Sequence, residues 1–184
     1  MGRTQPLIWQ RPAKVLSSVR ARVKHLARGE YHFVTCWRVR GEVAEVFEVL
    51  REPLALPRWW PDVYRSARET KAGDADGVGQ EVLLHTRGAL PYTLRWTVIA
   101  VGGAIPTRLT LNARGDLEGE GEWQLWQHGE YARLRFEWRV RARKPLLRRA
   151  WMLRPLFVWN HRWAMRRGEL RLRQELRRRV QKRL

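Results

Sequence analysis

The side chains that could carry out chemistry are few, and they form no known catalytic set. The five histidines show no metal-ligand spacing with Cys, Asp or Glu: His25, His32, His85, His128 and His161. The sequence has no nucleophile elbow, no phosphate-binding loop and no dinucleotide fingerprint. We therefore predict no catalytic residue, no metal and no nucleotide or other cofactor.

A small set of polar residues could orient a ligand instead. His85 and Asn112 fall in strand-like stretches where they could face an apolar interior. Asn160 opens a long helix one turn before Ala164, so this pair should point inward, whereas His161 is offset by about 100° and is expected to be exposed. A polar group in an apolar cavity must be hydrogen-bonded or it is costly, so each could bind a ligand carbonyl or hydroxyl. The alternative for each is a side chain on the solvated face.

Aromatic residues dominate the predicted inner faces of the strands that would carry these groups. Tyr131–Ala142 alternates between apolar and charged residues, which predicts a strand with one buried face and one wet face. In the preceding strand, Gly119 and Gly121 leave the inner face without side chains, so that something else must fit there. The sheet should therefore enclose a cavity, and the predicted ligand-lining aromatics are Trp37, Trp59, Trp60, Tyr92, Trp96, Trp123 and Trp138. The alternative is that these rings only fill the core.

The periodicity of the sequence predicts helices at both ends and strands between them. A basic amphipathic helix over 12–28 precedes a strand over 31–40, a short helix over 42–50 and a proline-rich stretch around Trp59 and Trp60. Six more strands and a last helix follow, at roughly 63–71, 78–87, 92–101, 107–114, 117–125 and 131–142, then from Pro145 or Pro155 to Val180. Consecutive strands joined by short turns pair antiparallel. The fold class is therefore α+β, with a seven-stranded antiparallel sheet wrapped around a long C-terminal helix.

The net charge of +19 is concentrated at the two ends of the chain. Residues 1–30 carry +6, residues 31–140 carry −1 and residues 141–184 carry +14. Basic residues at helical spacing could form one face that docks on anionic membranes. They are Arg20, Lys24 and Arg28 on the first helix, and Arg162, Arg166, Arg173 and Arg177 on the last. The alternatives are that this charge only keeps the protein soluble, or that it reflects a genomic preference for Arg.

The remaining composition bears on compartment and partners. Cys36 is the only cysteine, so no internal disulfide can form, and no apolar run is long enough for a signal peptide or a membrane span. We therefore expect a soluble cytoplasmic protein that could also lie peripherally at a membrane. Nucleic acid is not expected as a partner, because the strand aromatics are predicted to be buried. The oligomeric state stays open.

Six short motifs, in the same order, resemble one known superfamily. They are Val43–Leu50 after the first strand, PRWWP at 57–61, GVG at 77–79, RGALPYTLRW at 87–96, LEGEGEW at 117–123 and NHRWAMRRGEL at 160–170. These residues resemble the polyketide cyclase/dehydrase branch of the START-like, or SRPBCC, superfamily. The resemblance covers about residues 31–180 and implies a helix-grip domain over 31–184, preceded by a basic helical extension over 1–30. It implies a cavity for a hydrophobic small molecule rather than a named reaction.

Three functions are compatible with these observations. The first is a binding or carrier protein for a lipid, quinone, isoprenoid or polyketide-like molecule, with the long helix or the loop at Trp59 and Trp60 moving to admit it. The second is a metal-free cyclase or dehydratase that uses the same cavity, for which His85 is the one candidate acid or base. The third is a peripheral protein that binds anionic membranes.

Overall fold

The strands and helices follow one another in the order predicted from the sequence. The computed structural model describes residues 30–143 and 154–182. In chain order the elements are β1 (Glu30–Arg40), α1 (Val43–Leu50), the 3₁₀ turn η1 (Pro53–Ala55), α2 (Leu56–Trp59), β2 (Tyr64–Lys71), β3 (Glu81–Arg87), β4 (Thr93–Gly102), β5 (Arg108–Gly115), β6 (Leu117–His128), β7 (Tyr131–Ala142) and α4 (Arg154–Gln181). The predicted α+β class is confirmed. The predicted helix over 12–28 lies outside the described residues.

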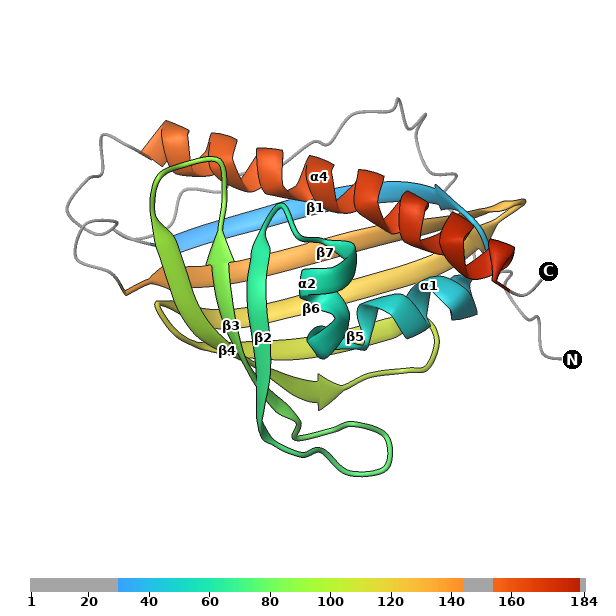
Figure 1. Ribbon diagram of the computed structural model, residues 1–184, viewed down its shortest axis with the longest axis horizontal. Helices are drawn as coiled ribbons and strands as arrows, with labels where there is room; N and C mark the ends of the chain where they lie inside the picture. Colours follow the sequence, from blue (N-terminus) through green and yellow to red (C-terminus); the bar gives the residue numbers. More distant parts are fainter. Residues whose placement is uncertain (1–29, 144–153, 183–184) are drawn as a thin grey trace, which may run out of the picture.

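The seven strands form one antiparallel sheet in the order β1-β7-β6-β5-β4-β3-β2. Strands β2 to β7 pair with their neighbours in the chain, and the one crossover, between β1 and β2, contains α1, η1 and α2. The sheet curves, and α4 runs along β1 with the short helices nearby (Figure 1). This confirms the predicted sheet around a long C-terminal helix.

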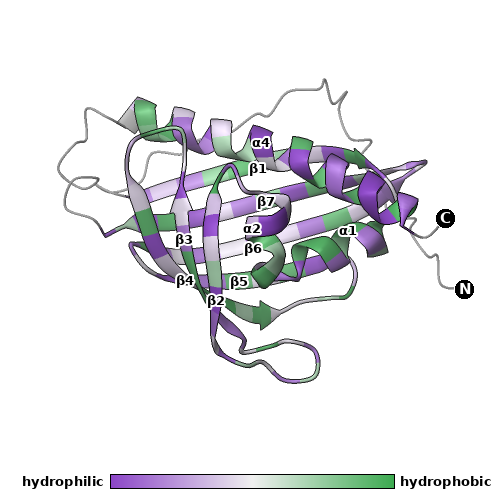
Figure 2. Cartoon of the chain, viewed as in Figure 1, coloured by the Kyte–Doolittle hydropathy of each residue, from purple (hydrophilic) through white to green (hydrophobic). Residues whose placement is uncertain are grey.

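One face of the sheet is buried because apolar and polar residues alternate along its strands. In β7, Phe136, Trp138 and Val140 are buried, whereas Arg139, which lies between the last two, is exposed. Glutamates of β6 lie on the outer face, where Glu120 is opposite Arg139 in the register and Glu118 pairs with Arg143 at 2.5 Å. Figure 2 shows the alternation as bands of hydrophobic and hydrophilic colour across the strands.

Gly121 leaves room for an aromatic ring on the inner face, as the sequence indicates. A Cβ at this position would lie 2.7 Å from the ring of Trp138 and 2.9 Å from Cδ1 of Leu111. Such distances are shorter than van der Waals contact, so Gly121 is what allows Trp138 to lie against β6.

Helix α4 also covers part of the free edge of β1. The backbone N–H of Arg38 donates to Oε1 of Glu169 at 3.1 Å, and the backbone oxygen of Arg38 accepts from Arg173 at 3.0 Å. Glu169 and Arg173 also pair with each other at 2.6 Å, one turn apart on α4. An exposed strand edge is open to pairing with another chain. These contacts therefore fix the helix along β1 and block its edge at Arg38.

Strand β3 begins at Glu81, later than the predicted start at Val78. The carboxylate of Asp74 accepts hydrogen bonds from the backbone N–H groups of Asp76 and Val78, at 3.0 and 2.9 Å. A side chain that bonds its own backbone two residues on forms a local turn. The turn competes with the ladder and delays the strand.

Candidate functional site

A cavity of about 230 Å³ lies between the inner face of the sheet, α2 and the first half of α4. Its wall is mostly apolar. Eight of the residues predicted to bind ligand contribute to it: Trp59, Trp60, Tyr92, Trp96, Trp123, Trp138, Asn160 and Ala164. The structure thus brings these eight side chains around one space. That they contact a ligand remains a prediction.

His85 and Asn112 face away from the cavity, which corrects the expectation that they line it. Their neighbours Leu84 and Ala113 are buried, and successive side chains of a strand point to opposite faces. Asn112 is exposed, and His85 is half-buried on the outer face. His85 is therefore not available as an acid or base inside the cavity.

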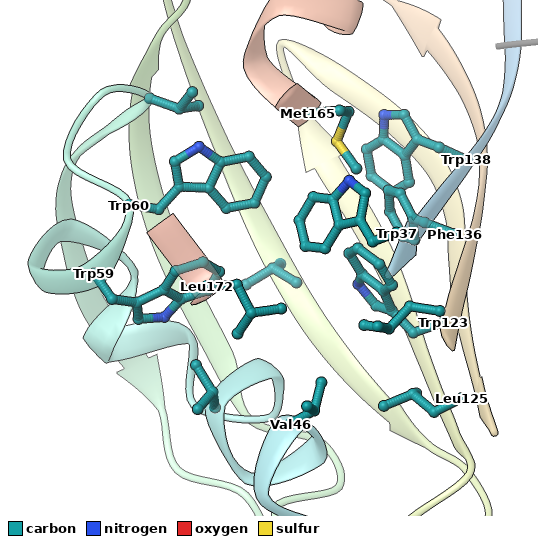
Figure 3. Close-up of a cluster of buried hydrophobic side chains, with 14 of the residues drawn as sticks. Trp37, Val46, Trp59, Trp60, Trp123, Leu125, Phe136, Trp138, Met165 and Leu172 are labelled. Atoms are coloured by element: carbon teal, nitrogen blue, oxygen red, sulfur yellow. The ribbon is translucent and has the colours of Figure 1, made fainter. Parts of the chain in front are cut away.

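Trp37 points inward but is not among the residues that line the cavity, so the expectation that it lines the cavity is also corrected. It is 2% exposed. Its ring packs against Trp60 and Trp123, with centroids 5.6 and 4.8 Å apart. Trp37 therefore fills the space between Trp60 and Trp123 (Figure 3).

Stacked aromatic rings form the wall on the side of the sheet. Trp123 stacks on Phe136 with centroids 4.3 Å apart and an interplanar angle of 20°, and Phe136 stacks on Trp138 at 5.6 Å and 23°. Figure 3 shows these three rings on one side and Trp59 and Trp60, from the α2 segment, on the other. A wall of stacked aromatic rings suits a planar apolar ligand.

Two ion pairs hold the segment of Trp59 and Trp60 against α4. Arg58 donates to both carboxylate oxygens of Glu175, at 2.9 and 2.8 Å. Arg171 donates to Asp62, at 2.5 and 3.3 Å. Burial alone would raise the pKa of Glu175, but hydrogen bonds from Arg58 and a second arginine hold that pKa below its ordinary value. The hydrogen bond from Arg171 likewise lowers the pKa of Asp62.

Trp59 and Trp60 are buried, so they do not form an opening of the cavity. Trp59 is 3% exposed and Trp60 is 5% exposed. The Trp60 ring lies against Gly168 of α4, where a Cβ would overlap the indole. A movement that admitted ligand at this end would have to break this packing and both ion pairs.

Asn160, nearer the start of α4, bonds to the turn between β3 and β4. Its Oδ1 accepts from the backbone N–H groups of Ala89 and Leu90 at 2.8 and 3.3 Å, and its Nδ2 donates to the hydroxyl of Tyr92 at 3.2 Å. A Cβ on Gly88 would overlap the Asn160 side chain, so a glycine is needed there. Burial raises the pKa of Tyr92 to about 12, although the bond from Asn160 opposes the shift. One side chain therefore joins α4 to this turn.

His161 faces the cavity, contrary to the expectation that it is exposed. Its ring stacks on Phe33 with centroids 3.9 Å apart, and its Nε2 is buried without a hydrogen-bond partner among the described residues. Burial, and to a smaller extent the charge of Arg162, lowers the pKa of His161 to about 3, so the imidazole is neutral. The sequence does hold a sign of this, because His161 shares a helical stripe with the buried Met165 and Leu172.

The basic residues predicted on the last helix have different surroundings. Arg162, Arg166 and Arg177 are exposed. Arg173 is instead engaged with Glu169 and with the backbone of β1. Their predicted counterparts Arg20, Lys24 and Arg28 lie outside the described residues.

The sequence matches no protein-family model and no curated protein. The structure, in contrast, matches solved structures over most of its length. The aromatase/cyclase Zhui from Streptomyces sp. R1128 aligns with a TM-score of 0.65 over 82% of this chain and 96% of that chain, at 17% identity. A START superfamily protein from Mycobacterium smegmatis aligns with a TM-score of 0.63 over 78% of this chain and 97% of that chain, at 14% identity.

A two-domain protein extends the same likeness. The di-domain ARO/CYC BexL aligns with a TM-score of 0.55 over 79% of this chain and 50% of that chain, at 15% identity. Identities of this size show a shared fold and not a shared activity. The chain therefore has the START-like helix-grip fold that its sequence motifs resemble.

Proposed function

We propose that this START-like chain binds a hydrophobic small molecule in the cavity between the sheet and α4. The observation that carries the proposal is about 230 Å³ of space walled by stacked aromatic rings. Apolar surface that leaves water contributes about 25 cal/mol per Å², so a ligand burying about 200 Å² gains roughly 5 kcal/mol before the cost of association.

The size of the cavity narrows the ligand class. An apolar cavity of about 150 Å³ can hold benzene, so one of about 230 Å³ suits a group of about two fused rings. Of the classes that the sequence suggests, a quinone-like or polyketide-like ring system is favoured over a long lipid chain. A longer ligand would require α4 or the α2 segment to move.

The cyclase or dehydratase alternative would use the same cavity. With His85 on the outer face, His161 is the imidazole at the wall. A general base works best when its pKa is near the operating pH. A pKa of about 3 makes His161 a weak base at neutral pH. This supports binding over acid–base catalysis.

In the described parts of the chain, no three His, Cys, Asp or Glu residues form a cluster that could hold a metal ion.

Equilibrium dialysis with naphthalene tests the proposal. Ala164 lines the cavity and Ala44 is exposed on α1, so Ala164→Phe fills the cavity while Ala44→Phe is a matched control. The wild type and Ala44→Phe should bind the probe, and Ala164→Phe should bind it at least about tenfold more weakly, a difference of about 1.4 kcal/mol. Equal binding by both variants would place the site elsewhere, and no binding to the wild type would count against a ligand-binding function.

A second candidate function is docking on an anionic membrane, and the exposed face of α4 favours it. Trp159 is 50% exposed and Leu170 is 49% exposed. Arg166 and Arg177 lie on the same stripe, because the helix repeats every 3.6 residues. Apolar side chains interleaved with basic ones are typical of helices that lie in a lipid interface. No helix of the described residues is long and apolar enough to cross a membrane.

Vesicle flotation tests the membrane proposal. Binding should require phosphatidylserine, weaken with salt and fall when residues 1–30 are deleted. The pair Arg166→Gln and Arg177→Gln should reduce it, whereas the pair Arg65→Gln and Arg68→Gln, exposed on β2, should not. Equal flotation with neutral and anionic vesicles, or none with either, would contradict docking.

A further inference from the structure

We propose that the cavity selects ligands that carry a hydroxyl group, and that His161 is the residue that bonds to this hydroxyl. The ligand would then be a planar, uncharged apolar molecule of about two fused rings with a phenol-type or alcohol hydroxyl. The inference rests on the proposed function and deepens it by naming the polar group that the ligand presents.

The buried nitrogen of His161 is the observation that carries the inference. Its Nε2 is inaccessible to solvent and has no hydrogen-bond partner among the described residues. The ring belongs to the cavity wall, and stacking on Phe33, with an interplanar angle of 17°, holds its orientation. A buried polar atom without a partner costs free energy. A ligand that pairs with Nε2 removes that cost.

Two other polar side chains of the wall are already engaged by the protein. Asn160 uses its oxygen on the β3–β4 turn and its nitrogen on Tyr92. The hydroxyl of Thr86 accepts from Nε1 of Trp96 at 3.3 Å and donates to the backbone oxygen of Leu94 at 3.4 Å. These two groups therefore hold the wall together.

A hydroxyl fits this site better than a carbonyl or a carboxylate. A neutral imidazole carries one donor nitrogen and one acceptor nitrogen, and a hydroxyl can pair with either because it both donates and accepts. A carbonyl only accepts, so it fits one tautomer alone. A carboxylate would bring an unpaired charge into an apolar space, which is costly, and the lowered pKa of His161 leaves no positive charge to meet it.

Two indole groups on the α2 side could also pair with a ligand oxygen. The Nε1 atoms of Trp59 and Trp60 are buried without a partner among the described residues. An indole N–H only donates, so it would donate to a methoxy oxygen as readily as to a hydroxyl oxygen. The loss of affinity caused by replacing His161 therefore separates this residue from the indoles, which the substitution leaves in place.

Equilibrium dialysis with naphthalene, 2-naphthol and 2-methoxynaphthalene tests the inference on the wild type, His161→Phe and His85→Phe. His161→Phe should raise the Kd of 2-naphthol about 5- to 10-fold relative to that of naphthalene, the effect of one net hydrogen bond. The methoxy oxygen of 2-methoxynaphthalene only accepts, so its Kd should follow that of naphthalene if Nε2 is the acceptor nitrogen, and that of 2-naphthol if Nε2 carries the proton. His85→Phe, on the outer face, should leave all three unchanged.

Each outcome decides a different claim. If His161→Phe changes the Kd of naphthalene and 2-naphthol by the same factor, the inference is wrong while the cavity still binds ligand. If the wild type binds neither probe, the proposed function fails and the inference with it. A measurement on the wild type alone does not depend on whether a variant folds. In the wild type, the imidazole ¹⁵N shifts of His161 should respond to 2-naphthol and not to naphthalene, and the same response to both would overturn the inference.

Discussion

At the scale of single residues, a neutral histidine in the wall links the cavity to the stability of the fold. An unfolded histidine has a pKa of about 6.5, and His161 in the folded chain has a pKa of about 3. Between these values the unfolded chain binds more protons than the folded one. The contribution of His161 to stability is therefore fully present above about pH 6.5 and is lost as the pH falls toward 3.

We predict that His161→Phe makes the free energy of unfolding less dependent on pH. Between pH 7.5 and 4.5 the wild type should lose about 3 kcal/mol more than the variant, because the variant has no imidazole to protonate on unfolding. Glu175 and Asp62 also weaken the fold in acid, since their pKa values are lowered, but they do so in both proteins. Urea unfolding at the two pH values measures the difference. Parallel losses would mean that the folded chain protonates His161 freely.

We predict that Gly168→Ala destabilises the protein, although Ala is favoured over Gly in a helix by about 1 kcal/mol. The added methyl group would overlap the Trp60 indole, and overpacking typically costs about 1–3 kcal/mol. Trp60→Phe in the same chain should recover part of the loss. Urea unfolding of the two single variants and the double variant measures the coupling. Strictly additive effects would show that the two residues do not touch.

Individual site residues were predictable where strand alternation decides their direction. Tyr92 and Trp96 follow it and line the cavity. His85 does not, because Leu83 and Leu84 are both apolar and leave the parity of β3 ambiguous. His161 was predicted to be exposed because Asn160 was used to set the inward side of the helix. Asn160 lies at the margin of that side, bonded to a turn, and one residue along a helix is a rotation of about 100°.

At the scale of elements, the contact between α2 and α4 should contribute measurably to stability. We predict that Glu175→Gln lowers the free energy of unfolding by about 1–3 kcal/mol. The substitution removes the charge of a buried carboxylate that is paired with Arg58. Glu48→Gln is the matched control, since its pair with Arg51 at 3.4 Å is exposed and should contribute little. Equal effects of the two substitutions in urea unfolding would show that this contact does not hold α2.

The two ends of the cavity should differ in how easily they open. The α2 end is fixed by two ion pairs, whereas the β3–β4 turn is joined to α4 through Asn160. We predict that Asn160→Ala speeds the release of bound 2-naphthol by about tenfold, the effect of losing one or two hydrogen bonds. Asn112→Ala, exposed on the outer face, should not change it. Stopped-flow dilution measures the rates, and equal rates would show that the Asn160 contact does not limit release.

The elements themselves were largely predictable, because alternation over Tyr131–Ala142 and its neighbours is a strong pattern. The boundaries that were missed depend on side chains rather than on periodicity. Asp74 bonds to its own loop and delays β3, which a pattern of apolar residues does not show. The contacts of Glu169 and Arg173 with the edge of β1 likewise depend on how the helix docks.

At the scale of the whole molecule, the cavity follows from covering a curved sheet with one long helix and a short one. The helix packs tightly where Gly168 meets Trp60, and farther toward its start the small side chain of Ala164 leaves space between it and the sheet. The order of motifs along the sequence was enough to predict this architecture. The volume, the closed α2 end and the part played by His161 required the structure.

Native mass spectrometry of the protein purified from its own host tests the central claim most directly. Wild type and Ala164→Phe should be compared side by side, because the substitution fills the cavity without altering the exposed surface of α4. We predict that the wild type carries a small apolar molecule of one defined mass and that the variant carries none. A bare mass for both proteins, or the same bound molecule on both, would contradict the claim that this cavity is a ligand site.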